Sequence, residues 1–167
     1  MKSKLSSLCC YAKGKVEVRS LTKQNYVSTE NMLPNKCGLT YASSMPSINY
    51  TQQYLEGDVL VSNIRPYFKK IWYADKDGGC SNDILVFRAL PNCDPAFLYY
   101  VLANDSFFDY STATSKGTKM PRGDKSAIMD YEVPDFDITT QRKIAALMSG
   151  LDNRIANNTA INDNLAA

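Results

Sequence analysis

The chain has 167 residues, of which 44% are hydrophobic and 22% charged, and these proportions are ordinary for a single globular domain with an appended helix. The formal net charge is only +2, so a nucleic-acid site has to come from local clusters of Lys and Arg rather than from overall basicity. The sequence contains no His, which removes the commonest general acid–base residue and metal ligand and excludes Ser–His and Cys–His nucleophile systems.

The cysteine pattern and the N-terminal residues indicate in which cellular compartment the protein works. The five Cys are odd in number and show no CxxC spacing, which argues against a disulfide framework and against a zinc site, so we expect incidental thiols and no metal. Residues 1–8 are basic and Ser-rich but lack the apolar core of a signal peptide. No apolar run approaches the roughly 18 residues that a membrane span needs. The sequence therefore predicts a cytoplasmic protein without a membrane partner.

Up to about residue 135 the predicted elements are mainly short strands. Residues 15–19 alternate between polar and apolar, and 58–64 form a nearly continuous apolar run that is typical of a buried strand. Further strands are predicted at 70–74 and 84–87. Residues 129–133 alternate apolar side chains with acids, which predicts a strand with one solvent-facing side.

Two short helices interrupt these strands. Asp94 is predicted to cap a helix that has Pro95 in its first turn and ends near residue 102, and a second helix is predicted over 106–110. Many short strands with few short helices indicate an α+β fold, in which a mixed, curved β-sheet displays loops from a rigid base and so suits recognition. Loops are predicted at 28–34, 42–46 and 115–124.

From Ile138 onward the sequence has neither Pro nor aromatic residues and follows helical spacing, which divides the chain into a domain at 1–135 and a helical segment at 136–167. Asp137 or Thr139 can cap the helix, which would run to about residue 165 and span roughly 40 Å at 1.5 Å per residue. Its apolar residues repeat at alternating intervals of four and three, as in a coiled coil. The predicted partner-facing stripe comprises Ile144, Met148, Leu151, Ile155, Asn158, Asn162 and Leu165, widened by Leu147 and Ile161.

This stripe has two interpretations. The helix could fold back on its own domain, but a stripe of this length needs a partner of similar length, and the first region predicts no such helix. An intersubunit partner is therefore favoured. Asn158 and Asn162 lie within the stripe, where buried Asn lowers stability but can fix register and partner orientation.

Two clusters of cations suggest a nucleic-acid site. Residues 115–125 carry four cations against one acid, with two Gly and one Pro that mark a shaped loop. Lys side chains there can neutralise phosphates, and Arg122 can also pair with guanine in the major groove. Residues 63–70 interleave cations with aromatics directly after a buried strand, and Asn63 offers the donor and acceptor that base-edge reading requires. Taken alone, either cluster is more typical of a solvated surface loop, and the presence of both on one small domain favours the nucleic-acid interpretation.

Catalysis by this chain is not supported. Residues 94–97 (DPAF) faintly resemble the catalytic motif of amino-methyltransferases, but the second Pro and a Gly-rich cofactor loop are missing, and a capped helix start explains them. No carboxylates share a spacing that would hold magnesium as in a nuclease. Residues 117–119 lack the frame of a phosphate-binding loop. We expect no enzyme activity and no cofactor.

With these residues in view, nearly the whole chain closely resembles the specificity (S) subunits of type I restriction–modification systems. The central motifs are specific, whereas the helix pattern alone would not be. The resemblance is carried by residues 25–32 (NYVSTENM), 57–60 (GDVL), 63–67 (NIRPY), 78–79 (GG), 81–86 (SNDILV), 116–124 (KGTKMPRGD), 141–145 (QRKIA) and 151–155 (LDNRI).

The resemblance implies a non-catalytic targeting role. In that family a target-recognition domain reads one half of a split double-stranded DNA site, and long helices pack antiparallel and receive methyltransferase (M) subunits, which join restriction (R) subunits. Carried onto this sequence, the DNA-binding residues would be Asn63, Arg65, Tyr67, Lys69, Lys70, Ser81, Asn82, Lys116, Thr118, Lys119, Arg122 and Lys125.

The sequence departs from the family pattern because it has one recognition domain and one helix, and so looks like half of a specificity subunit. Two copies that pair through the stripe would rebuild the two-domain shape around a two-fold axis, which predicts an antiparallel homodimer. Two alternatives stay open at this point. One is a stand-alone DNA-binding regulator, and the other is an inactive fragment or a cassette for domain shuffling.

Overall fold

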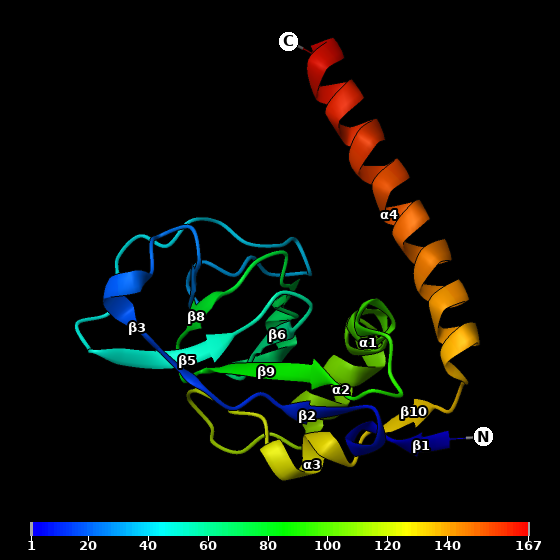
Figure 1. Cartoon of the computed structure of the whole chain (residues 1–167), viewed down its shortest axis with the longest axis horizontal. Helices are drawn as coiled ribbons and strands as arrows, with labels where there is room; N and C mark the ends of the chain where they lie inside the picture. The colour runs from blue at the N-terminus through cyan, green and yellow to red at the C-terminus, as the bar shows by residue number, and fades with distance from the viewer. Residues whose placement is uncertain (1, 167) are drawn as a thin grey trace.

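The computed structural model describes residues 2–166 and shows an α+β fold built on three small sheets (Figure 1). The central sheet has the strand order β2–β9–β6–β7 and is antiparallel throughout. The second sheet has the order β3–β5–β8–β4, in which only the β4–β8 pair is parallel. A third sheet pairs the two distant strands β1 and β10. The strands are β1 (Lys2–Lys4), β2 (Cys9–Tyr11), β3 (Lys15–Glu17), β4 (Tyr26–Val27), β5 (Tyr50–Tyr54), β6 (Val59–Ser62), β7 (Ile71–Tyr73), β8 (Gly78–Cys80), β9 (Ile84–Ala89) and β10 (Glu132–Pro134).

The central sheet is buried on both faces, which explains the continuous apolar runs of its strands. Side chains alternate between faces along a strand. On β6, Val59 and Val61 therefore belong to the core beneath the helices, whereas Leu60 belongs to the core shared with the second sheet. On β9, Phe87 faces the helices and Val86 faces the second sheet. Each fully buried side chain of this kind contributes about 1.5–3 kcal/mol to folding.

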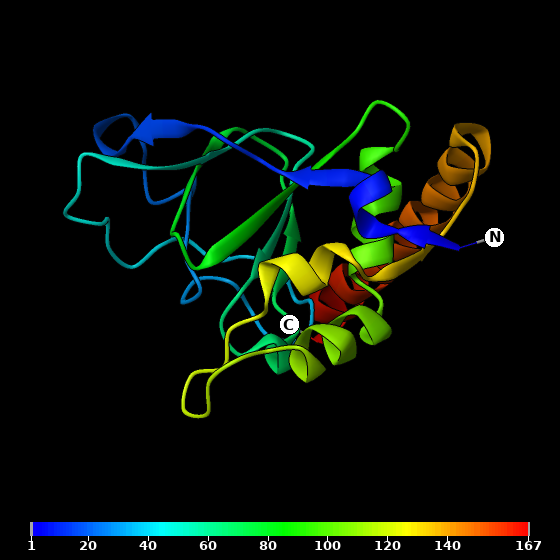
Figure 2. The same cartoon turned by 90° about the horizontal axis from the view of Figure 1, so that it is seen from below.

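Three short helices cover one face of the central sheet (Figure 2). They are α1 (Pro95–Leu102), α2 (Asp105–Ala113) and α3 (Lys125–Met129). Each begins at a side-chain cap: Asp94 accepts from the Phe97 N–H, and Asn104 and Asp124 do the same for α2 and α3. The predicted cap and first turn of α1 are confirmed, and α2 is longer than the predicted 106–110. Three 3₁₀ turns complete the local structure, at η1 (Leu5–Ser7), η2 (Val18–Ser20) and η3 (Pro66–Phe68).

The strand predictions at 58–64, 70–74 and 84–87 are confirmed as β6, β7 and β9, but two others need correction. The predicted strand at 15–19 ends at Glu17, where the chain turns into η2. The predicted strand at 129–133 is wrong in its first half because Met129 ends α3, and β10 begins only at Glu132. The helix forms because Asp124 caps it and Ile128 is buried, and these outweigh the strand-like alternation.

A buried ion pair joins the start of β6 to β9. The Asp58 carboxylate, with 3% of its side chain exposed, accepts from Arg88 Nε at 2.8 Å and from Arg88 Nη2 at 2.6 Å. Asp58 also accepts from the Leu55 N–H at 2.8 Å. The hydrogen bonds that Arg88 donates to Asp58 raise the pKa of its guanidinium. A bidentate pair with a further backbone donor satisfies this buried carboxylate.

The long helix α4 (Ile138–Ala166) begins as predicted, with Asp137 accepting from the Thr140 N–H at 2.7 Å. Its first turns pack on the domain, because the buried Gln141 side chain accepts from the Asp94 N–H at 2.9 Å and donates to the Asn92 carbonyl at 3.2 Å, and Ala145 is buried in the core beside α1. Every side chain from 151 to 165 is exposed, and the helix leaves the domain (Figure 1). The fold-back interpretation therefore holds only for the first turns. The coiled coil and the boundary at residue 135 stay predictions.

Three further features of residues 2–166 bear on chemistry and location: the thiols, possible metal ligands and the apolarity of the helices. All five cysteines are free, and burial raises the pKa of Cys80 and Cys93 to about 12, which keeps these thiols protonated and unreactive. Within the same residues no cluster of His, Cys, Asp and Glu is placed to hold a metal ion. No described helix is both long enough and apolar enough to cross a bilayer.

Candidate nucleic-acid interface

Three segments that are far apart in the sequence meet at one end of the central sheet. They are the turn 63–65 after β6, the turn 81–83 before β9, and the loop 115–124 between α2 and α3, and we call them together the convergent site. The register causes this meeting, because Ser62 pairs with Ile84 and the end of β6 therefore lies beside the start of β9. The loop joins them through the Arg65 N–H, which donates to the Pro121 carbonyl at 2.8 Å.

Asn63 is the centre of this arrangement. Its N–H donates to the Asp83 carbonyl at 2.8 Å, and its carbonyl accepts from the Gly123 N–H at 3.1 Å. One residue thus fixes all three segments through its backbone. Its side chain is only 8% exposed, and Gly123 packs so closely that a Cβ there would lie 2.8 Å from Asn63 Oδ1. The amide that the sequence predicted to read base edges is therefore covered by the loop.

The loop itself is closed at its base. Lys116 and Arg122 exchange two backbone hydrogen bonds of 2.9 Å, as in a short β-bridge. The Lys116 ammonium also pairs with Asp124, which caps α3. This hydrogen bond from Lys116, with those from the helix N–H groups, lowers the pKa of the Asp124 carboxyl. Thr118 and Lys119 are exposed in the span that this closure presents to solvent.

Within residues 2–166, both unpaired buried polar side-chain atoms and one of the four non-glycine residues with positive φ lie at the convergent site. Arg65 has a φ of 50°, a left-handed conformation that costs a non-Gly residue about 1–3 kcal/mol. Among residues 2–166, the buried side-chain polar atoms without a hydrogen-bond partner are Asn63 Oδ1 and Arg65 Nε. Strained backbone and unsatisfied polar groups are uncommon in folded proteins and cluster where function requires them.

The guanidinium of Arg122 and the carboxylate of Asp83 form an ion pair on the surface of the convergent site. Arg122 Nη2 donates to Asp83 Oδ1 at 3.0 Å, and 55% of the Arg122 side chain stays exposed. Of the neighbouring predicted residues, Asn82 and Lys125 are exposed and Ser81 is half-buried. The sequence prediction did not include Asp83 or Gly123, although both lie within the motifs that carry the family resemblance.

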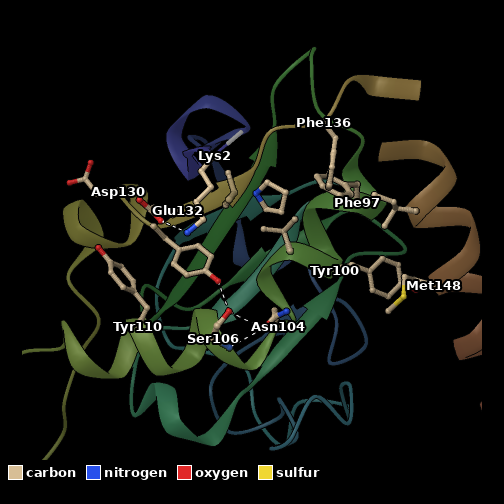
Figure 3. Close-up of a pocket in the computed structure, with 15 residues that line it drawn as sticks. Lys2, Phe97, Tyr100, Asn104, Ser106, Tyr110, Asp130, Glu132, Phe136 and Met148 are labelled. Carbon is tan, nitrogen blue, oxygen red and sulfur yellow. Dashed lines mark hydrogen bonds and ion pairs between the residues drawn. The ribbon is translucent and has the colours of Figure 1, made fainter. Parts of the chain in front are cut away.

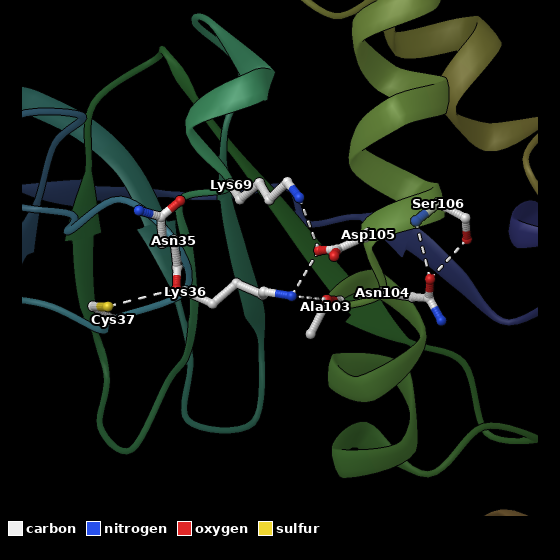
Figure 4. Close-up of polar contacts among 8 residues, drawn as sticks. All are labelled: Asn35, Lys36, Cys37, Lys69, Ala103, Asn104, Asp105 and Ser106. Carbon is white, nitrogen blue, oxygen red and sulfur yellow. Dashed lines mark hydrogen bonds and ion pairs between the residues drawn. The ribbon is translucent and has the colours of Figure 1, made fainter.

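Lys69 and Lys70 already bind protein acceptors. Lys69 and Lys36 both pair with Asp105 at the start of α2, at 3.1 and 2.8 Å, and they lower the pKa of that carboxyl (Figure 4). Lys70 Nζ donates to the Thr29 carbonyl at 2.6 Å. These contacts fasten η3 to α2 and to the loop around residue 36. They orient the tip of η3, where the Tyr67 side chain is 48% exposed.

A separate apolar groove of about 860 Å³ lies between α1, α2, β10 and the first turns of α4 (Figure 3). Ile144 and Met148, which the sequence predicted for the partner-facing stripe, line this groove. Ile144 packs against the domain core, whereas Met148 is 37% exposed. The stripe therefore divides into a part that packs on its own domain and a part, from Leu151 to Leu165, whose side chains are exposed.

Comparison with known proteins agrees with this architecture. The sequence matches the family described as "Type I restriction modification DNA specificity domain" over residues 1–167. The chain belongs to this family. It is 27% identical over 153 residues to the HindI specificity subunit of Haemophilus influenzae, which covers 84% of this chain and 32% of that protein. It is 26% identical over 92 residues to the EcoDI specificity subunit of Escherichia coli, which covers 55% of this chain and 20% of that protein.

Solved structures show the same fold. The HsdS subunit from Thermoanaerobacter tengcongensis superposes with a TM-score of 0.72 at 22% identity, over 94% of this chain and 43% of that one. The type I restriction–modification S subunit from M. genitalium superposes with a TM-score of 0.64 at 22% identity, over 94% of this chain and 40% of that one. The chain thus spans about a third or less of the curated relatives and less than half of these solved chains.

Proposed function

We propose that this member of the specificity-subunit family is a non-catalytic targeting protein that reads a DNA half-site through the convergent site and acts in the cytoplasm. The observation that carries the proposal is the meeting of three family-like motifs, from turns 63–65 and 81–83 and loop 115–124, on one rigid backbone framework. Base reading requires side chains that are held in place and still reach solvent, and this framework supplies both.

Within the site the predicted residues divide by their surroundings. Lys119 and Lys125 are exposed and neutralise phosphates, which positions the protein on DNA without reading sequence. Lys116 joins them on DNA by exchanging Asp124 for a phosphate. Arg122 reads a base, because its guanidinium is exposed and its backbone is fixed on both sides. The other predicted residues act as follows: Thr118, Ser81, Asn82 and Tyr67 contact the DNA at the rim, whereas Asn63, Arg65, Lys69 and Lys70 shape the surface.

The helix α4 supplies assembly. Its exposed apolar residues, including Leu151, Ile155 and Leu165, form a surface that favours a second helix rather than solvent. We propose that two copies pair antiparallel through this stripe, which places two identical recognition domains in inverted orientation. The paired helices would recruit the methyltransferase subunits, to which the restriction subunits join.

Selection from random double-stranded DNA tests the reading function. The 167-residue chain should enrich a defined half-site, and its affinity for that site should fall with salt as expected for several phosphate contacts. Adding the methyltransferase subunit should enrich two copies of the half-site in inverted orientation. A library that stays random with the chain, alone and with that subunit, would contradict the proposal.

A further inference from the structure

The ion pair between Asp83 and Arg122 is not explained by stability. The two side chains are 38% and 55% exposed, and exposed pairs of this kind contribute little to folding. A carboxylate at this position also opposes the approach of phosphates, which should weaken DNA binding in general. The Asp83 carboxylate thus lowers the affinity for DNA of any sequence that the surrounding cations supply. The geometry of the pair points to a role other than stabilising the fold.

The backbone holds both partners at a fixed separation. The Asp83 carbonyl accepts from Asn63, and Asn63 accepts in turn from Gly123, the neighbour of Arg122. Arg122 is further fixed by its two backbone hydrogen bonds with Lys116. The side-chain torsions of Asp83 and Arg122 remain free, and the long Arg122 side chain loses considerable entropy when DNA binding orders it. The hydrogen bond of 3.0 Å from Nη2 to Asp83 restrains those torsions before DNA arrives.

Guanine recognition by Arg requires the planar guanidinium to present two N–H groups to O6 and N7 in one orientation. An acceptor that occupies one Nη leaves the remaining N–H groups to the base and fixes the plane in which they lie.

We propose that Asp83 is a positioning residue, which orients Arg122 for the reading of one guanine and sacrifices affinity for random DNA in return for discrimination. The inference rests on the proposed function, because it assumes that Arg122 reads a base. Removing the carboxylate should therefore change affinity and specificity in opposite directions: random DNA binds more tightly, and the preference at one position weakens.

The experiment is DNA selection followed by titration with the 167-residue chain and its variants. Arg122→Ala should lose a preference of roughly 5- to 150-fold at one position of the selected site. Asp83→Ala should lose most of that preference and bind random DNA several-fold more tightly. Asp83→Asn should keep more of the preference, because an amide oxygen still accepts from the guanidinium. The double variant with Arg122→Ala should lose no more than Arg122→Ala alone.

Asp75→Ala is the matched control for the loss of one charge. Asp75 forms a comparable exposed pair with Lys76, at the opposite end of the central sheet, because Tyr73 pairs with Val59 at the start of β6. This variant should leave the selected site unchanged.

The outcomes separate this inference from the proposed function. If Asp83→Ala keeps the full preference at the position that Arg122→Ala erases, the positioning role is refuted while DNA reading stands. Equal losses in Asp83→Asn and Asp83→Ala also refute it, because the carboxylate would then act by charge alone. Additive losses in the double variant refute it as well, because Asp83 would then act independently of Arg122. A wild-type chain that selects no site overturns both proposals.

Discussion

Substituting Gly123 by Ala should loosen the convergent site, because the added Cβ has no room. A Cβ at this position would lie 2.8 Å from Asn63 Oδ1 and 2.8 Å from Ile128 Cδ1, well inside ordinary contact distance. Overpacking of this kind costs about 1–3 kcal/mol. The unfolded chain loses entropy when Gly becomes Ala, which returns about 0.4–1 kcal/mol. The net loss in the free energy of unfolding should be about 1–2 kcal/mol.

Gly150→Ala is the matched control, because the same chemical change is made where nothing lies within 4 Å. Gly150 occupies the interior of α4, where Ala is better than Gly by up to about 1 kcal/mol. The two variants should therefore differ by about 1–3 kcal/mol, which corresponds to roughly 2–12 °C in melting temperature for a chain of this size.

Urea denaturation and thermal melting measure this difference directly. Gly123→Ala should also reduce discrimination between the selected DNA site and random DNA, whereas Gly150→Ala should not. If Gly123→Ala is as stable as Gly150→Ala, the loop 115–124 does not pack on Asn63 as described. The reasoning about the convergent site would then fail with it.

Three further predictions concern the core, the DNA surface and the helix. Asp58→Ala should lower the free energy of unfolding by about 3 kcal/mol. This is near the lower end for a broken buried pair, because the Arg88 side chain is 35% exposed. A loss below about 1 kcal/mol in urea denaturation would contradict a stabilising role for this pair. Lys119→Ala should weaken binding to all DNA sequences alike and reduce the slope of log K against log salt by about 0.9, and an unchanged slope would remove Lys119 from the phosphate contacts. Leu151→Asp should convert the proposed dimer to monomers in light scattering, because a carboxylate would enter the apolar stripe, whereas Asn153→Asp on the opposite helix face should not. Equal oligomeric states for these two helix variants would refute pairing through the stripe.

The sequence predicted the elements whose local signals are strong. Burial on both faces makes the β6 and β9 strands continuously apolar, and the Asp94-Pro95 pair marks the start of α1. The error at 129–133 arose because alternation was followed where a cap and one buried side chain, Ile128, form a five-residue helix instead. Short helices of this kind lack the repeated period on which sequence reasoning depends.

The site was predictable as a set of loops but not as a single surface. The two basic clusters meet because the Arg65 N–H and the Asn63 carbonyl hydrogen-bond the loop 115–124, and the register of β6 on β9 places the turn 81–83 beside them. Both contacts depend on long-range packing. The roles of Lys69 and Lys70 depend on Asp105 and on the Thr29 carbonyl, which come from distant segments. The burial of Asn63 depends on how closely Gly123 approaches, and the sequence marks that contact only by the presence of a glycine.

We propose that this chain directs a DNA-modifying complex to a specific sequence. Adenine methylation should therefore be mapped across the genome in cells that carry the chain with a methyltransferase subunit of the same system, and in matched cells that lack only this chain. Cells with the chain should show a new methylated motif with two identical halves in inverted orientation, and Arg122→Ala should lose the specificity of that motif. Identical methylation in both cell populations, with the chain and the methyltransferase subunit both produced, would show that the chain does not direct methylation.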